Sequence, residues 1–232
     1  AVIWPAMLHA AGIALPQQVW AHGFVSLGGE RFSKSSGVKL DLGEAIDRYG
    51  VDAFRYVLLR EVPFDGDGNF SWERFEERYT SDLANALGNL ASRAIAMVEK
   101  YCDAVVPVAT RAASEADDDV DLAAYHSAMD GHRGWLLHEG LAAVGRMTAR
   151  ANEYTQATAP WQLAKDPARR VELDQCLASL IRRLARQAVL LSPFMPGKSE
   201  ALWTQLGAPA SVHAQRYDAL QQLDAAGWHV AK

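Results

Sequence analysis

The sequence predicts a mainly α-helical protein in which a short mixed α/β segment precedes a longer bundle of helices. From Ser71 onward, apolar residues recur at steps of three and four, the period of a helix with one buried face. Earlier, residues 19–27 show the β-rich pattern of a strand and are followed by a glycine turn. The 232 residues are 50% hydrophobic and 22% charged, which excludes a disordered or collagen-like chain.

In the mixed segment, residues 2–11 are predicted to be helical and 19–27 to form a strand. Gly28 and Gly29 then make a tight turn, and residues 31–39 form a polar, flexible loop. Two short helical patterns over 42–60 are divided at Gly50, and residues 64–70 form a turn-rich loop.

In the helical part, Ser71 is a plausible N-cap for a long helix that ends near residue 101. Further helices are expected over 122–155, from Pro160, over 169–191 and over 198–206. The change in pattern near residue 70 divides the chain into two domains, 1–70 and 71–232.

Several classes of protein are disfavoured. The two cysteines are far apart in helical patterns, so neither a disulfide framework nor a CxxC metal site is expected, and a reducing cytoplasm fits. The apolar opening over 1–15 is too short to span a membrane and lacks a basic leader. We expect it to be a helix of a larger fold whose beginning is missing. Three histidines six residues apart do not share a helix face, so no metal site is predicted.

The loop after the predicted strand carries the cations and hydroxyls that bind phosphate groups. Arg31 and Lys34 can neutralise phosphate oxygens, while Ser33 and Ser35 can donate hydrogen bonds. Most basic, serine-rich loops are merely solvated. The preceding strand and glycine turn favour a nucleotide site.

A second candidate site consists of polar and aromatic residues in the helical part. Asn85, Asn89 and Arg93 lie at four-residue steps on one helix stripe, and amide and guanidinium groups can bind unpaired bases. Trp161 follows Pro160 at a helix start, where its ring could stack on a base. From the residues alone, a solvated polar face and a packed corner tryptophan remain the alternatives.

Several motifs, in order, resemble one family. RFSKS at 31–35 resembles the KMSKS signature of class I aminoacyl-tRNA synthetases, and HGF at 22–24 resembles the lead-in of methionyl-tRNA synthetases. Segments 49–64 and 82–93 are similar to that family's stem-contact region and to the start of its anticodon-binding bundle. The resemblance implies that 1–70 is the end of a Rossmann-type catalytic domain with a KMSKS-type loop, and that 71–232 is an α-helical anticodon-binding domain.

The resemblance also implies roles for individual residues. Lys34, assisted by Arg31, would stabilise the transition state of methionine adenylation. The residues implied to bind ATP, with Mg²⁺, are Lys34, Ser33, Ser35, His22 and Val25. Those implied to read the anticodon are Asn89, Arg93, Asn152, Pro160, Trp161 and Asn85. Arg31 and Phe32 depart from the usual Lys and Met of the motif.

The implied partners are tRNA(Met), methionine, ATP and an N-terminal catalytic half, with no membrane and no metal site in this chain. A HIGH-type motif (His-x-Gly-His) and a cysteine cluster are absent from the sequence. We therefore expect this chain alone not to form methionyl-adenylate. Another class I synthetase and a non-catalytic tRNA-binding module are the alternative interpretations.

Two groups of charged residues have no assigned role. Residues 115–121 are rich in acid and are expected to form a solvated loop between helices. Arg182, Arg183 and Arg186 could touch a tRNA backbone or form a solvated face.

Overall fold

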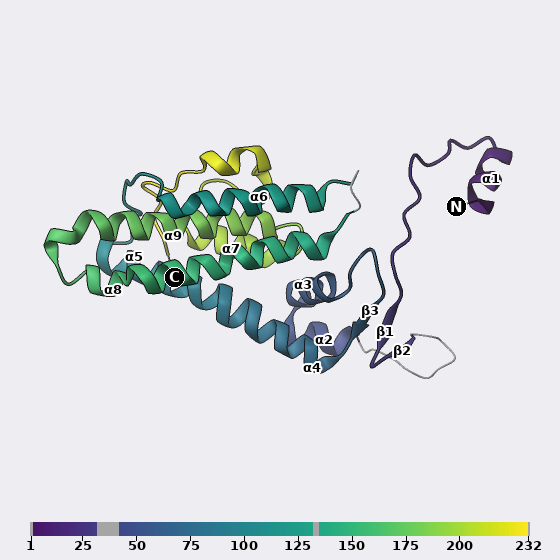
Figure 1. Cartoon of the computed structure of the whole chain (residues 1–232), viewed down its shortest axis with the longest axis horizontal. Coiled ribbons are helices and arrows are strands. Elements are labelled where there is room, and N and C mark those ends of the chain that lie inside the picture. The colour runs from purple at the N-terminus through teal and green to yellow at the C-terminus, as the bar shows by residue number, and fades with distance from the viewer. Residues whose placement is uncertain (1, 32–41, 132–134, 232) are drawn as a thin grey trace.

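The computed structural model describes residues 2–31, 42–131 and 135–231. A body of packed helices carries a small sheet at one end, and an extended segment leads from the sheet to the N-terminal helix α1 (Ile3–Ala10), which stands away from the body (Figure 1). No residue of α1 is buried. Within the described part of the chain, no helix is both long and apolar enough to cross a membrane.

The sheet has three short strands. β1 (Val25–Leu27) pairs antiparallel with β2 (Glu30–Arg31) and parallel with β3 (Gly68–Phe70), so the order is β2-β1-β3. The predicted strand over 19–27 is too long, because only Val25–Leu27 form a strand, although Phe24 O still accepts from Gly68 N of β3 at 2.8 Å. The segment 64–70, predicted to be loop throughout, supplies β3.

Two helices connect the sheet to the bundle. α2 (Leu42–Tyr49) and α3 (Val51–Glu61) are divided at Gly50, as predicted. Gly50 has φ of 82°, a left-handed conformation that costs glycine little. Arg78 and Arg74 each lie 2.5 Å from the buried Glu61 carboxylate, which holds α3 against the helix that follows.

The first long helix contains an unexpected π-helical stretch. α4 (Trp72–Arg78) continues through the π-helical segment η1 (Tyr79–Gly88) into α5 (Asn89–Cys102). Ser71 caps it as predicted, because its Oγ accepts from Arg74 N at 3.3 Å. In η1 the backbone hydrogen bonds run from residue i to i+5, so its turns are wider than those of an α-helix.

The next two helices form a hairpin. α6 (Ala116–Met129) and α7 (Leu137–Thr158) pack along each other (Figure 1), so the single helix predicted over 122–155 is wrong. The break begins at Asp130, whose extended backbone ends α6, and Trp135 on its far side has φ of 50°. Both helices keep apolar residues facing the core, and the apolar period therefore did not reveal the turn.

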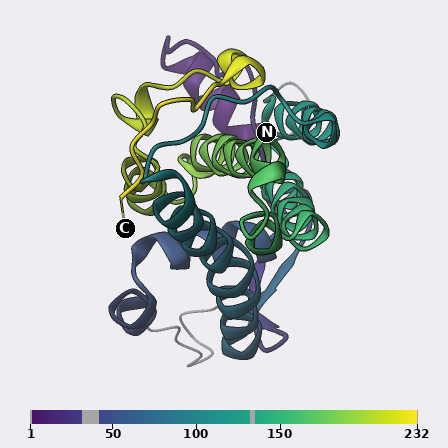
Figure 2. The ribbon, with the colours of Figure 1, turned by 90° about the vertical axis from the view of Figure 1, so that its left-hand side faces the viewer.

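The last helices complete the bundle. α8 (Pro160–Leu163) is followed by α9 (Arg170–Leu191) and α10 (Pro196–Gln205). Short 3₁₀ turns lie at η2 (Ala113–Glu115), η3 (Pro167–Arg169), η4 (Val212–Ala214) and η5 (Tyr217–Gln222). α9 is the central helix: it contacts α5, α7, α8 and α10, and the end view shows other helices arranged around it (Figure 2).

The acidic run and the arginines of α9 meet in the core. Glu115 is fully buried, and its carboxylate accepts from Arg182 at 2.8 Å and from Arg186 at 3.1 Å. Asp118, also fully buried, lies 3.4 Å from Arg183 and 3.3 Å from Arg150. The acidic run is therefore not a solvated loop: Glu115 and Asp118 are buried and pair with Arg182, Arg183 and Arg186, which are buried too, while Asp117 stays exposed.

Candidate nucleic-acid interface

The residues proposed to bind nucleic acid come together where α5, α7 and α8 approach one another. Arg93, on α5, places its guanidinium carbon 5.5 Å from the centre of the Trp161 ring. These residues are 68 positions apart in sequence, and both side chains are half-buried. A guanidinium over an indole face is a cation–π contact that leaves the other face of the ring for a further planar group.

Local backbone geometry positions Trp161. Ala159 adopts a left-handed conformation with φ of 45°, which ends α7 and turns the chain. Pro160 then starts α8 at a position where a missing N–H costs nothing, and its ring is buried. The buried proline and the sharp turn fix the start of α8, so the half-buried indole of Trp161 is presented at the corner.

Asn152 connects α7 to the π-helical segment. Its Nδ2 donates to Ala86 O at 3.2 Å and to Thr148 O at 3.1 Å. The two donors of the amide are thus both used within the protein. Only the amide oxygen of Asn152 is left to accept a hydrogen bond from a base.

Asn85 and Asn89 are exposed but do not belong to one regular α-helical stripe. Asn85 lies within η1, and Asn89 is the first residue of α5. Of these two asparagines, only Asn89 shares the regular helix α5 with Arg93.

The loop predicted over 31–39 is described only at its start. Ser33, Lys34 and Ser35 lie outside the described residues, as does the side chain of Arg31, whose backbone pairs with Ser26 across the sheet. Val25 is half-buried in β1 and opposite Gly68. His22 is exposed, with Nδ1 2.7 Å from Gly23 O and its ring 5.9 Å from Phe64.

The sequence does not single out the residues that hold the start of β1 and the glycine turn in place. Asp67 Oδ1 accepts from Phe24 N at 2.7 Å, and Asn69 Oδ1 accepts from Gly29 N at 3.0 Å. A side chain at Gly23 would meet Gly66 O at 1.9 Å, so the two loops touch backbone to backbone. The only signal is the alternation of Gly with Asp or Asn over 65–69, which predicts a turn-rich loop.

The described residues offer no metal centre: among them, no group of three or more His, Cys, Asp or Glu side chains could hold an ion.

Comparisons with known proteins identify the family that the chain resembles in sequence and fold. Residues 1–95 match the family described as tRNA synthetases class I (M). The chain is 44% identical over 209 residues to the methionine–tRNA ligase of Caldanaerobacter subterraneus subsp. tengcongensis, covering 89% of this chain and 33% of that protein. The ligase of Streptomyces coelicolor is 40% identical over 238 residues, covering 98% and 43%.

The fold matches a solved structure over its whole length. Mycobacterium tuberculosis methionyl-tRNA synthetase in complex with methionyl-adenylate superposes with a TM-score of 0.89 at 34% identity. The match covers 100% of this chain and 46% of the solved one. The chain thus spans between a third and half of the length of these relatives.

The strand and glycine turn leading into an RFSKS loop, followed by a helical bundle, define a class I aminoacyl-tRNA synthetase. Within that class, the chain belongs to the methionyl-tRNA synthetase family.

Proposed function

We propose that this chain supplies the ATP-closing loop and the anticodon-reading surface of a methionine–tRNA ligase. The ligase activates methionine with ATP and transfers it to tRNA(Met), in the cytoplasm. The observation that carries the anticodon assignment is the meeting of Arg93 and Trp161, half-buried, at a helix corner. The methionine–tRNA ligases among the relatives support the choice of substrate.

The division of labour follows the two parts of the chain. Residues 1–70 hold the loop in which Lys34 and Arg31 neutralise the phosphates of ATP, assisted by Ser33 and Ser35, while His22 and Val25 lie along the nucleotide. Mg²⁺ accompanies the ATP as part of the substrate. Residues 71–232 read the anticodon through Asn89, Arg93, Asn152, Pro160 and Trp161, with Asn85 at the margin.

Anticodon recognition is tested by titrating the 232-residue chain with a labelled stem-loop that carries CAU, and with a CUU stem-loop as its mismatch. Trp161→Ala should weaken CAU binding about 10- to 100-fold, since stacking on one base contributes roughly 1–3 kcal/mol. Trp4→Ala is the matched control, because Trp4 is 53% exposed on α1, away from this surface. Equal affinity of the chain for CAU and CUU would remove the assignment.

A second experiment separates a ligase from a non-catalytic tRNA-binding module. In a full-length ligase carrying this segment, Lys34→Ala should depress methionine-dependent ATP–pyrophosphate exchange and leave stem-loop binding unchanged. Trp161→Ala should do the reverse. Unchanged exchange in the Lys34→Ala ligase would favour the binding module.

A further inference from the structure

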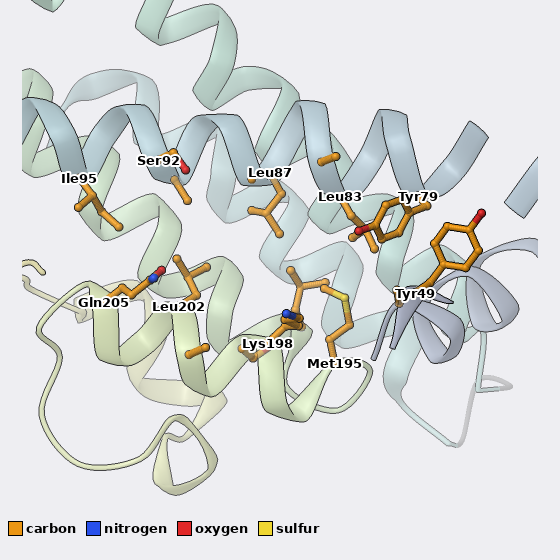
Figure 3. A pocket seen from close by; sticks show the side chains of 17 residues that line it. Tyr49, Tyr79, Leu83, Leu87, Ser92, Ile95, Met195, Lys198, Leu202 and Gln205 are labelled. Carbon is orange, nitrogen blue, oxygen red and sulfur yellow. The ribbon is translucent and has the colours of Figure 1, made fainter. Parts of the chain in front are cut away.

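A cleft of about 410 Å³ lies between η1 with α5 on one side and α10 on the other (Figure 3). Leu83, Leu87 and Ile95 project from the first wall, and Met195 and Leu202 face them from the second. This volume is within the range of small-molecule sites in proteins, which are mostly apolar with few polar groups. The cleft is separate from both sites described above.

The charge in the cleft is of one sign. Among the described residues that line it, Lys198 carries the only charged side chain, and no ion pair of Lys198 is found in the described part of the chain. The nearby Asp52 carboxylate accepts from the backbone N–H of Lys198 at 2.5 Å, at the start of α10. A cation beside an apolar wall favours a ligand with an apolar body and one negative charge.

Ser199 provides an independent indication of a polar ligand group. Its residue is 3% exposed, it lines the cleft, and its Oγ has no hydrogen-bond partner. A buried hydroxyl without a partner is unfavourable. An acceptor atom held next to Lys198 would satisfy it.

We propose that this cleft binds a small amphiphilic monoanion, an aromatic or branched aliphatic carboxylate. Its apolar body lies between Leu87 and Leu202, and its carboxylate pairs with Lys198 and accepts from Ser199. The π-helical segment η1 forms part of the cleft's upper wall, together with α5 (Figure 3). No tRNA takes part in this binding, so this proposal can be tested independently of the proposed function.

The experiment titrates the 232-residue chain with naphthalene-2-carboxylate by calorimetry, and with naphthalene-2-methanol as the neutral counterpart. We expect the carboxylate to bind about tenfold tighter than the alcohol, the size of effect expected for one charge-assisted contact. Lys198→Met should abolish that difference. Lys165→Met is the matched control, because Lys165 is exposed on another face and does not line the cleft.

A second variant locates the ligand. Ser92→Trp, at an exposed position on the rim, places an indole over the cleft and should remove saturable binding. Circular dichroism and thermal unfolding establish that both variants are folded. Equal binding of acid and alcohol, binding unchanged by Lys198→Met or by Ser92→Trp, or no saturable binding at millimolar ligand would each overturn the proposal.

Discussion

The buried charge of Glu115 is stabilised by partners that lie far away in the sequence. Its buried carboxylate binds Arg182 and Arg186 of α9 and also accepts from Ala112 N at 3.1 Å. Replacing an ion pair by apolar groups can be neutral, but removing one partner leaves the other charge buried and unpaired. Here one carboxylate serves two buried guanidinium groups.

Glu115→Gln should therefore lower the free energy of unfolding by about 3–5 kcal/mol, the cost of breaking a buried pair. Urea denaturation at pH 7 measures it. Glu172→Gln is the matched control, because Glu172 pairs with Arg169 at 2.6 Å on the surface, where the two side chains are about half exposed. A similar, small loss in both variants would show that the Glu115 cluster is solvated.

The same carboxylate predicts how stability changes with pH. Burial raises the pKa of Glu115, but Arg182 and Arg186 outweigh it and hold the pKa below its ordinary 4.5. A lowered folded-state pKa adds stability above pH 4.5 that is lost as the pH falls through the folded value. Asp118 acts in the opposite direction, because burial raises its pKa despite Arg183 and Arg150.

Stability of the native protein should thus fall more steeply below about pH 4.5 than that of Glu115→Gln, in which Asp118 is retained. Urea midpoints measured from pH 7 to pH 3 give the two slopes. Parallel slopes would mean that Glu115 does not carry the acid sensitivity.

At the scale of elements, the π-helical segment η1 differs from the neighbouring α-helices in the effect of replacing a glycine by alanine. Gly88 ends η1, and a Cβ there would lie 2.9 Å from Leu83 O, the carbonyl five residues earlier. In an α-helix, alanine is more stable than glycine by roughly 0.5–1 kcal/mol. In η1 the close approach reverses the preference.

Gly88→Ala should accordingly destabilise the protein, whereas Gly145→Ala should stabilise it by roughly 0.5–1 kcal/mol. Gly145 is the matched control, since it is exposed within α7 and nothing lies within 4 Å of its added Cβ. Thermal unfolding of both variants gives the signs. Stabilisation by Gly88→Ala would indicate that the segment is an ordinary α-helix in solution.

Helices could be predicted from the sequence because their signals are local. The cap at Ser71, the division at Gly50 and the helix start at Pro160 are each encoded within a few residues. The π-helical turns could not be predicted, because Asn85 and Asn89 keep their four-residue spacing whichever helix they occupy. The turn at Asp130 could not be predicted either, because the apolar pattern continues on both sides of it.

The candidate site was only partly predictable for a related reason. Each residue type was visible, but Arg93 and Trp161 are 68 positions apart, and they approach each other only because α5 and α8 both pack against α9. The acidic run likewise looks solvated until α9 is known to be central and to bring Arg182 and Arg186 to it. Charge patterns alone do not separate a solvated face from a buried pair.

Across the whole molecule, α3 connects the sheet end to the bundle through polar contacts with the chain around α10. Arg55 Nε donates to Phe194 O at 2.9 Å and its Nη2 to Pro193 O at 2.8 Å, while Asp52 caps the start of α10. These contacts span nearly 140 positions of sequence. They are positioned to keep the sheet end and the helical bundle in a fixed relation.

Arg55→Gln should loosen α3 without loosening α9. Because hydrogen bonds from a charged group contribute roughly 1.5–3 kcal/mol, amides of α3 should exchange with solvent about tenfold faster or more, while those of α9 keep their protection. Hydrogen-exchange mass spectrometry measures both helices in one experiment. Arg60→Gln is the matched control on the same helix, since Arg60 makes no hydrogen bond to the bundle within the described residues. Loss of protection in both α3 and α9 would mean that the two ends unfold as one unit and that Arg55 stabilises the whole chain. Unchanged exchange in α3 would show that apolar packing alone keeps α3 in place.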